Sequence, residues 1–328
     1  MDSRFVRPQI LLARLHFELP VVQATSTARD GDDTKTGTKK LFKLPGTLKL
    51  RKKDTTVVFV AGATGNVGSR TVKELVKSGL RVRAGVRSID KAESILGVSI
   101  SYHVYDQLEI IDCDLEKPEE IESALGNSGV VICAIGASEK EVLDVTGPYR
   151  IDYEATKNLI AAAKNAEVKH FILVTSLGTT KFGLPASVLN LFWGVLIWKA
   201  KAEKALIDSG LAYTIVRPGG MERPTDAFKE THNLRLAPKD TFTGGQVSRL
   251  QVAELLACIA NNLELAEDKI LEAIAETSAP LRSLEDLLIE IPSQKKVEKD
   301  EPKKKVVEAI QVDTPPIISS RPLSPYPR

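Results

Sequence analysis

Three regularly spaced glycines, Gly62, Gly65 and Gly68, follow a run of apolar residues and precede a helical pattern. In such a segment the first glycine permits a tight turn, and the second lets backbone amides approach a diphosphate. The third lets the helix pack closely on the strand, so that the helix N-terminus faces the phosphates with its N–H donors. The G-x-x-G-x-x-G spacing therefore favours a dinucleotide site over a plain turn. The predicted site also includes three of the four residues between the glycines, Thr64, Asn66 and Val67.

Arg87 lies at the end of the next strand-like run, where the residue that contacts the adenosine ribose of a dinucleotide is expected. An acid in this place, about twenty residues after the glycines, would bind the 2′-hydroxyl of NAD. Residues 83–88 contain no acid, and an arginine can pair with a 2′-phosphate through two N–H donors. We therefore predict NADP as the cofactor. A solvated arginine after a strand is the alternative.

The elements that must position these residues begin near residue 55, where short β-branched runs alternate with helical patterns. Strand-like runs lie at residues 57–61, 81–86, 108–113, 130–135, 171–175 and 213–217. Helical patterns lie near residues 67–78, 119–125, 151–165 and 188–208, and residues 250–260, 270–275 and 284–291 complete the set. Nearly continuous apolar strands are typical of a parallel sheet covered on both faces. The alternation predicts an α/β fold, a doubly wound parallel sheet of the Rossmann type, in one domain over residues 55–292.

Both ends of the chain, residues 1–54 and 293–328, lack this pattern, and we predict that both are disordered. Residues 1–34 contain arginines and few acids, which is typical of a targeting presequence. Residues 35–53 carry eight Lys or Arg and no acid. They form either a solvated linker or a contact with an anionic membrane surface. The tail from residue 292 holds seven prolines and no glycine, and it cannot bury enough apolar surface to fold.

An uncharged stretch, residues 182–198, includes both tryptophans. It is at the lower limit of a membrane-spanning length and is interrupted by Pro185, Asn190 and Gly194. We predict a core helix of the domain here, with a membrane-touching surface as the alternative.

Composition excludes several classes of function. The net charge of +2 gives no field suited to nucleic acid. Cys113, Cys133 and Cys258 are widely spaced, and the four histidines lack metal-ligand spacing. We therefore expect neither a disulfide framework nor a metal site.

Beyond the glycines and Arg87, three further motifs stand in the order seen in atypical short-chain dehydrogenase/reductases, and the chain resembles this family. They are Asp-Cys-Asp-Leu at residues 112–115, Val-Thr-Ser at 174–176 and Thr-Ile-Val-Arg-Pro-Gly at 214–219. The resemblance implies a cofactor site built from the ends of successive strands. Asp114 and Leu115 would lie by the adenine, Ile135 and Gly136 along its ribose, and Thr175 and Ser176 near the nicotinamide, with Pro218 completing the site.

Catalysis in conventional members of the family needs a tyrosine that exchanges a proton with the substrate and a lysine four residues later. Ser176 matches their serine, and Lys199 and Lys201 are candidates for their lysine, but the residues four before them are Val195 and Ile197. No tyrosine lies between residues 171 and 212, and loss of such a proton donor costs roughly 10²–10⁴ in rate. We favour a redox sensor or scaffold that binds NADP(H). The alternative is a reductase that uses Ser176, Lys199 or a bound water differently.

Residues 135–141, 191–196 and 216–226 resemble one plant branch of the family, the NADP-dependent, dehydrogenase-like components associated with the chloroplast Tic import translocon. Members of this branch also carry proline- and serine-rich repeats that tether ferredoxin-NADP reductase to membranes. Pro-Leu-Ser-Pro-Tyr at residues 322–326 resembles the start of such a repeat. The resemblance implies a chloroplast protein, peripheral on the inner envelope or thylakoid membrane. Its implied partners are Tic components and, through the tail, this reductase.

Overall fold

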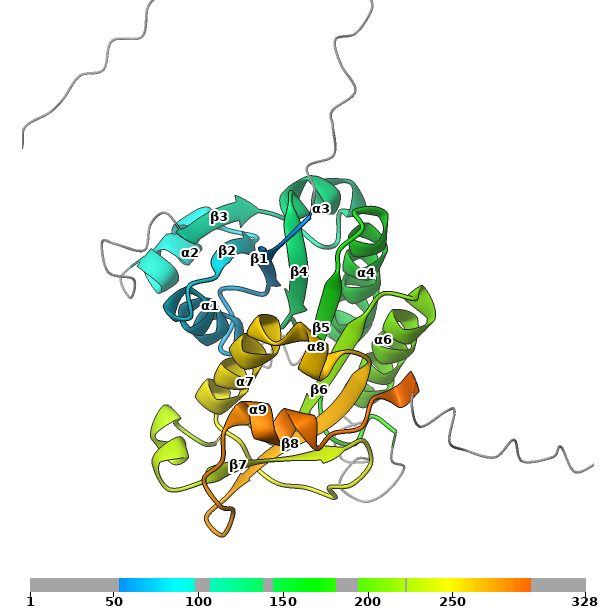
Figure 1. Cartoon of the computed structure of the whole chain (residues 1–328). Helices are drawn as coiled ribbons and strands as arrows, with labels where there is room; N and C mark the ends of the chain where they lie inside the picture. The colour runs from blue at the N-terminus through cyan, green and yellow to red at the C-terminus, as the bar shows by residue number, and fades with distance from the viewer. Residues whose placement is uncertain (1–52, 98–106, 138–143, 181–193, 222, 296–328) are drawn as a thin grey trace, which may run out of the picture. The chain divides into compact units, whose positions relative to one another are not determined.

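The computed structural model describes residues 53–97, 107–137, 144–180, 194–221 and 223–295. Nearly all of the two ends predicted to be disordered therefore lies outside the described residues. The described part holds one sheet with helices on both faces (Figure 1). None of its helices has the length and apolar character needed to cross a bilayer.

The sheet of the described residues has eight strands in the order β3-β2-β1-β4-β5-β6-β8-β7. The strands are β1 (Asp54–Ala61), β2 (Arg81–Val86), β3 (Leu108–Asp112), β4 (Ser128–Cys133), β5 (His170–Val174), β6 (Tyr213–Pro218), β7 (Asn233–Pro238) and β8 (Lys269–Glu276). All neighbouring pairs from β3 to β8 are parallel, and β7 pairs antiparallel with β8. The order reverses between β1 and β4. This arrangement confirms the predicted doubly wound α/β sheet.

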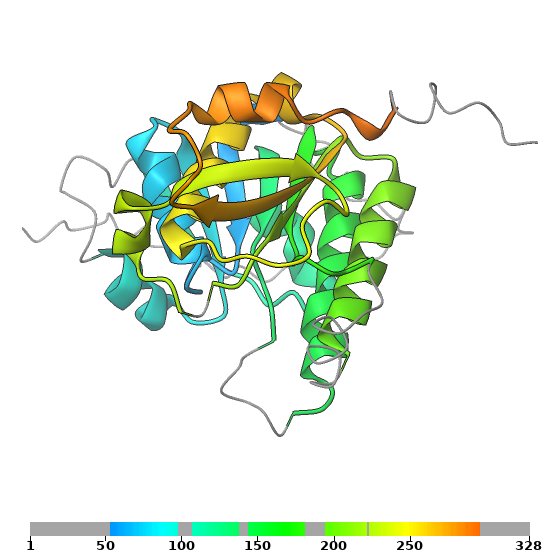
Figure 2. The same ribbon diagram turned by 90° about the horizontal axis from the view of Figure 1, so that it is seen from below.

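Helices cover both faces of the sheet (Figure 2). One face carries α1 (Gly68–Lys77), α2 (Ile89–Leu96), α7 (Arg249–Asn261), α8 (Leu263–Ala266) and α9 (Leu284–Ile289). The other carries α3 (Pro118–Leu125), the π-helix η3 (Pro148–Ala155), α4 (Thr156–Asn165) and α6 (Val195–Ser209). A 3-10 helix, η4 (Asp226–Glu230), precedes β7.

Alternate residues of the central strands enter two separate cores. Val58 and Val60 of β1 pack with the α1 and α7 side, while Phe59 and Ala61 pack with the α4 and α6 side. Every residue of β4 and of β6 is buried. A strand covered on both faces needs apolar residues at successive positions, which explains the continuous apolar runs in the sequence.

Four elements of the described fold were not predicted: α2, β7 and the two short helices η4 and α8. Only Ala92 and Leu96 of α2 are buried, so its apolar stripe is too short to stand out. Its start is set instead by Ser88, whose side chain caps the helix by accepting a hydrogen bond from the Lys91 amide. β7 is an edge strand of mixed burial, and its polar–apolar alternation covers only residues 233–236, the shortest run that indicates a strand.

Two predicted helices begin differently in the structure. The predicted helix near 151–165 starts earlier, as the π-helix η3, and continues as α4. The predicted helix near 188–208 is seen as α6 from Val195, after Gly194 in a left-handed conformation (φ 69°). Residues 188–193 lie outside the described residues.

The described chain continues a few residues past the predicted domain end at 292. The Gln294 amide donates to the carbonyl of Asp268 (2.8 Å), and the Lys295 ammonium lies 2.6 Å from the Asp268 carboxylate. At the other end, Asp54, the first residue of β1, already pairs with Ser128 of β4.

Candidate dinucleotide site

The carboxyl ends of the parallel strands β1 to β6 all lie at the same end of the sheet. The predicted site residues follow these strand ends. The glycine segment Gly62–Gly68 follows β1, Arg87 follows β2, Asp114 and Leu115 follow β3, Ile135 and Gly136 follow β4, Thr175 and Ser176 follow β5, and Pro218 ends β6. The fold thus gathers them around the point where the strand order reverses, which is where open α/β sheets bind ligands. Pro218 itself is buried, and its carbonyl accepts a hydrogen bond from the Leu177 amide (3.0 Å).

The glycine segment has the tight geometry that its spacing predicts. Gly62 has φ of 78°, and the Gly65 amide donates to its carbonyl at 2.9 Å. A Cβ on Gly68 would lie 2.1 Å from the Gly62 carbonyl oxygen, so α1 can approach the turn only without a side chain there. Gly65 and Asn66 are exposed. A ligand could therefore approach the backbone at the start of α1.

Arg87 is exposed, directly before the capped N-terminus of α2. Within the part of the chain that the structure describes, it forms no ion pair. By contrast, Arg81 and Arg83 on the same strand pair with Asp54 and Glu109. A guanidinium without an internal partner at this place can bind an anionic group of a ligand.

Lys199 lies on α6 and is paired with Asp152 of η3, at 2.6 Å between the ammonium and a carboxylate oxygen. The Asp152 side chain is 1% exposed and its other oxygen accepts from the Ala137 amide (3.3 Å). A Cβ on Gly136 would lie 3.5 Å from this carboxylate and 3.8 Å from the ammonium. The ion pair therefore lies directly beside the strand end predicted to line a ribose. Asp152 was not predicted as a site residue, because it is one of two acids at the start of this helical pattern, with Glu154, and no local signal distinguishes it.

The tyrosines that contact α6 come from η3. The ring centroids of Tyr149 and Tyr153 lie 4.8 and 5.8 Å from that of Trp198. The Lys201 ammonium lies 4.1 Å from the Trp198 ring centroid, and Tyr149 is 42% exposed. We call Tyr149, Tyr153, Trp198 and Lys201 the aromatic face of α6.

A buried ion network lies beneath the ends of β5, β6 and β8. The Arg217 side chain, 2% exposed, donates to both oxygens of Glu203 (3.0 and 2.6 Å) and to Asp240 (3.1 Å). Glu272, also buried, accepts from three backbone amides, those of residues 240–242. Burial alone would lower the pKa of Arg217, but its hydrogen bonds and charge interactions with Glu203, Asp240 and Glu272 outweigh burial and raise it. The sequence signal was an arginine inside an apolar strand, which requires a buried partner.

A model of the NAD(P)H-binding family matches residues 62–263, more than half of the chain. The chain belongs to this family. Two similar relatives are named "Protein TIC 62, chloroplastic". The one from Pisum sativum is 63% identical over 256 residues, covering 75% of this chain and 48% of the relative. The one from Oryza sativa subsp. japonica is 59% identical over 284 residues, covering 84% and 56%.

The chain thus spans about half the length of these relatives. Both are chloroplast proteins by name, in agreement with the location predicted from the sequence. Among solved structures, a putative NAD-dependent epimerase/dehydratase from Bacillus halodurans is 23% identical, with a TM-score of 0.58 over 71% of this chain and 98% of that one. This likeness supports the Rossmann fold expected of an atypical short-chain dehydrogenase/reductase.

The thiols of this NAD(P)H-binding domain are poorly suited to redox chemistry. Burial raises the pKa of Cys113 and of Cys133 to about 11, and burial together with the nearby Glu285 raises that of Cys258 to about 12. Thiols with such a high pKa are almost entirely protonated near neutral pH and are therefore unreactive. Within the described ranges, no group of His, Cys, Asp and Glu has the arrangement of a metal site.

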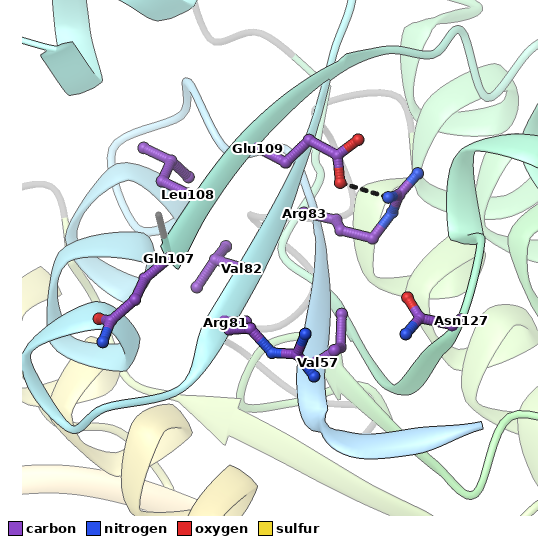
Figure 3. Close-up of a pocket in the computed structure, with 8 residues that line it drawn as sticks. All are labelled: Val57, Arg81, Val82, Arg83, Gln107, Leu108, Glu109 and Asn127. Carbon is purple, nitrogen blue, oxygen red and sulfur yellow. Dashed lines mark hydrogen bonds and ion pairs between the residues drawn. The ribbon is translucent and has the colours of Figure 1, made fainter. Parts of the chain in front are cut away.

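A pocket at the other edge of the sheet does not belong to the dinucleotide site (Figure 3). It lies at the amino ends of β1 to β3 and is lined by Val57, Arg81, Val82, Arg83, Gln107, Leu108, Glu109 and Asn127. Its two arginines pair with Asp54 and Glu109. Because these charges already have partners, the pocket offers little to a charged ligand.

Proposed function

We propose that this chain is an NADP(H)-binding redox sensor or scaffold of chloroplast membranes, associated with protein import. The observation that carries the proposal is Arg87, at the end of β2 beside the glycine segment in a member of an NAD(P)H-binding family. Its guanidinium has no ion-pair partner among the described residues. NADP differs from NAD by the 2′-phosphate, and a guanidinium binds phosphate through charge-assisted hydrogen bonds. The dinucleotide would lie across the strand ends named above.

Titration calorimetry with NADPH and NADH tests the choice of cofactor. Arg87→Ala should weaken NADPH binding by about 1.5–3 kcal/mol, with little effect on NADH. Arg81→Ala is the matched control, because Arg81 lies at the opposite, amino end of β2 and pairs with Asp54. Equal losses for both cofactors in Arg87→Ala would refute the 2′-phosphate assignment.

Binding without robust turnover is favoured by the surroundings of Lys199. Its ammonium is held by Asp152 at 2.6 Å, and Val195 occupies the position from which a tyrosine would donate a proton. The second candidate function is an NADPH-dependent oxidoreductase in which Ser176 and Lys199 act differently. Steady oxidation of NADPH with any member of a panel of quinones and aldehydes, abolished by Ser176→Ala, would favour this enzyme over the sensor.

The import and reductase assignments rest on the relatives named TIC 62 and on residues 322–326, which lie outside the described residues. We propose Tic translocon components as partners, and ferredoxin-NADP reductase as a partner of the tail. Co-purification of the full chain from plastid membranes, with and without residues 322–328, tests both. Failure of both the full and the shortened chain to recover Tic subunits would remove the import assignment, and recovery of the reductase without the tail would remove the tail as its binding segment.

Membrane attachment is proposed to be peripheral, through the basic residues 35–53 with help from the face that carries Trp193 and Trp198. Trp193 lies outside the described residues, and Trp198 belongs to the aromatic face of α6. Each Lys or Arg near an anionic surface contributes about 1 kcal/mol, which salt screens. Aromatic insertion is not weakened by salt. Flotation with anionic vesicles at low salt and in about 1 M salt, with NADP⁺ or NADPH, separates the two contributions. Absence of flotation in all four conditions would refute the membrane contact.

A further inference from the structure

The hydroxyl of Thr175 has its only proton committed to a buried carboxylate. Thr175 Oγ1 donates to Glu203 Oε1 at 2.7 Å, and the residue is 5% exposed. A carboxylate oxygen accepts and cannot donate, so the direction of this hydrogen bond is fixed. The Thr175 hydroxyl therefore has only its lone pairs left for a further partner.

Glu203 is itself held in one position. Its two oxygens accept from the Arg217 guanidinium at 3.0 and 2.6 Å, and the Thr179 hydroxyl also donates to it (3.2 Å). A bidentate pair of this kind, with both side chains at most 5% exposed, leaves the carboxylate little freedom to rotate. The orientation of the Thr175 hydroxyl is consequently set by the network and not by solvent.

The position of Thr175 relates it to one end of the proposed dinucleotide. The glycine segment follows β1 and Arg87 follows β2, so the diphosphate and the adenosine half lie over β1 and the strands on its β3 side. The other half must then extend over the ends of β4 and β5. Thr175 is the first residue after β5 and precedes Ser176.

We propose that Thr175 accepts a hydrogen bond from the carboxamide NH₂ of the nicotinamide, which makes the site selective for an amide at that position. This inference rests on the proposed NADP binding. An amide NH₂ donates to the fixed lone pairs of the hydroxyl, whereas the carboxylate of a nicotinic acid dinucleotide only accepts and would face them without a proton. Loss of such a hydrogen bond with a buried acceptor left unpaired is the usual source of strong discrimination between otherwise similar ligands.

The test compares three ligands on the full chain by calorimetry: NADP⁺, its nicotinic acid analogue and 2′-phospho-ADP-ribose, which lacks the pyridine ring. We expect NADP⁺ to bind about tenfold more tightly than the nicotinic acid analogue. Thr175→Val should reduce this preference to about threefold or less and leave binding of 2′-phospho-ADP-ribose unchanged. Thr175→Ser, which keeps the hydroxyl, should retain the preference.

Thr179→Val is the matched control, because Thr179 also donates to Glu203, and it should retain the preference. Equal binding of NADP⁺ and the nicotinic acid analogue to the unsubstituted chain would overturn the inference while leaving NADP binding intact. A preference unchanged in Thr175→Val would also overturn it. If 2′-phospho-ADP-ribose does not bind at all, the proposed function fails and the inference fails with it.

Discussion

Substituting Gly65 should separate nucleotide binding from folding. Gly65 is exposed, and its φ does not lie in the left-handed region. Among the described residues, a Cβ added there would meet only the Gly62 carbonyl oxygen, at 3.1 Å, so the chain needs to adjust by a few tenths of an ångström. We expect Gly65→Ala to change the free energy of unfolding by less than about 1 kcal/mol. The new methyl group would nevertheless stand where the diphosphate approaches the backbone, and NADPH affinity should fall at least about tenfold.

Gly68→Ala should behave differently, because its Cβ would collide with backbone. The added atom would lie 2.1 Å from the Gly62 oxygen, 2.8 Å from the Gly62 carbonyl carbon and 3.2 Å from the Ala63 Cα. Helix α1 must then move away from β1, and overpacking of this kind typically costs about 1–3 kcal/mol. For a domain of this size the melting temperature should fall by about 2–10 °C.

Urea unfolding and NADPH calorimetry on both variants provide the assay. Gly97→Ala is the control, since no atom of the described residues lies within 4 Å of its added Cβ and its φ of −66° suits alanine. NADPH binding by Gly65→Ala as tight as that of the unsubstituted chain would refute the diphosphate contact at Gly65. Phosphates would then not contact this segment. A loss of stability in Gly65→Ala equal to that in Gly68→Ala would contradict the separation of binding from folding.

Three further predictions concern stability and reactivity. Burial, partly offset by Asp268, lowers the pKa of His170 to about 4. As the pH falls from about 6.5 to 4, the imidazole is protonated in the unfolded chain before it is protonated in the folded one. About 3 kcal/mol of the free energy of unfolding should therefore be lost. Urea midpoints at pH 7 and 4.5 should show a smaller loss for His170→Gln than for the unsubstituted chain. Cys113 and Cys133 should react with iodoacetamide at pH 8 roughly a hundredfold more slowly than free cysteine, as mass spectrometry can measure; rapid alkylation of the native protein would show that burial does not protect them. A fragment of residues 53–295 should melt at a higher temperature than one of residues 53–292, because it keeps the contacts of Gln294 and Lys295 with Asp268; equal melting would place the domain end at 292.

The parts of the fold that sequence analysis predicted are those with strong local signals. A strand such as β4, buried along its whole length, needs a continuous apolar run, and this run is visible in the sequence at residues 130–133. The glycine segment was equally predictable. A Cβ on Gly68 would overlap the Gly62 carbonyl, so the close approach of α1 requires glycine at this position. In such places each residue type follows from its own surroundings.

The missed parts depend on contacts between segments far apart in the sequence. Asp152 and Lys199 are 47 residues apart, and nothing local shows that they meet beside Gly136. Glu203 looks like an ordinary helical acid until β5 and β6 bring Thr175 and Arg217 to it. The roles of the predicted site residues toward a cofactor stay predictions, which the substitutions above address.

The Arg217 network also determines when the domain can be completed during synthesis. Arg217 and Glu203 are made early, but the Glu272 carboxylate, which holds residues 240–242 beside Arg217, lies in the last strand to leave the ribosome. Until β8 has emerged, β6 lacks one neighbour in the sheet, and the loop that carries Asp240 lacks the three hydrogen bonds that its backbone amides donate to Glu272. The part of the proposed site that would bind the adenosine half can therefore form on the nascent chain from β1 to β3. The half beneath Thr175 must wait for nearly the whole domain, so nascent chains that stop before residue 272 should acquire protease resistance only over their first strands.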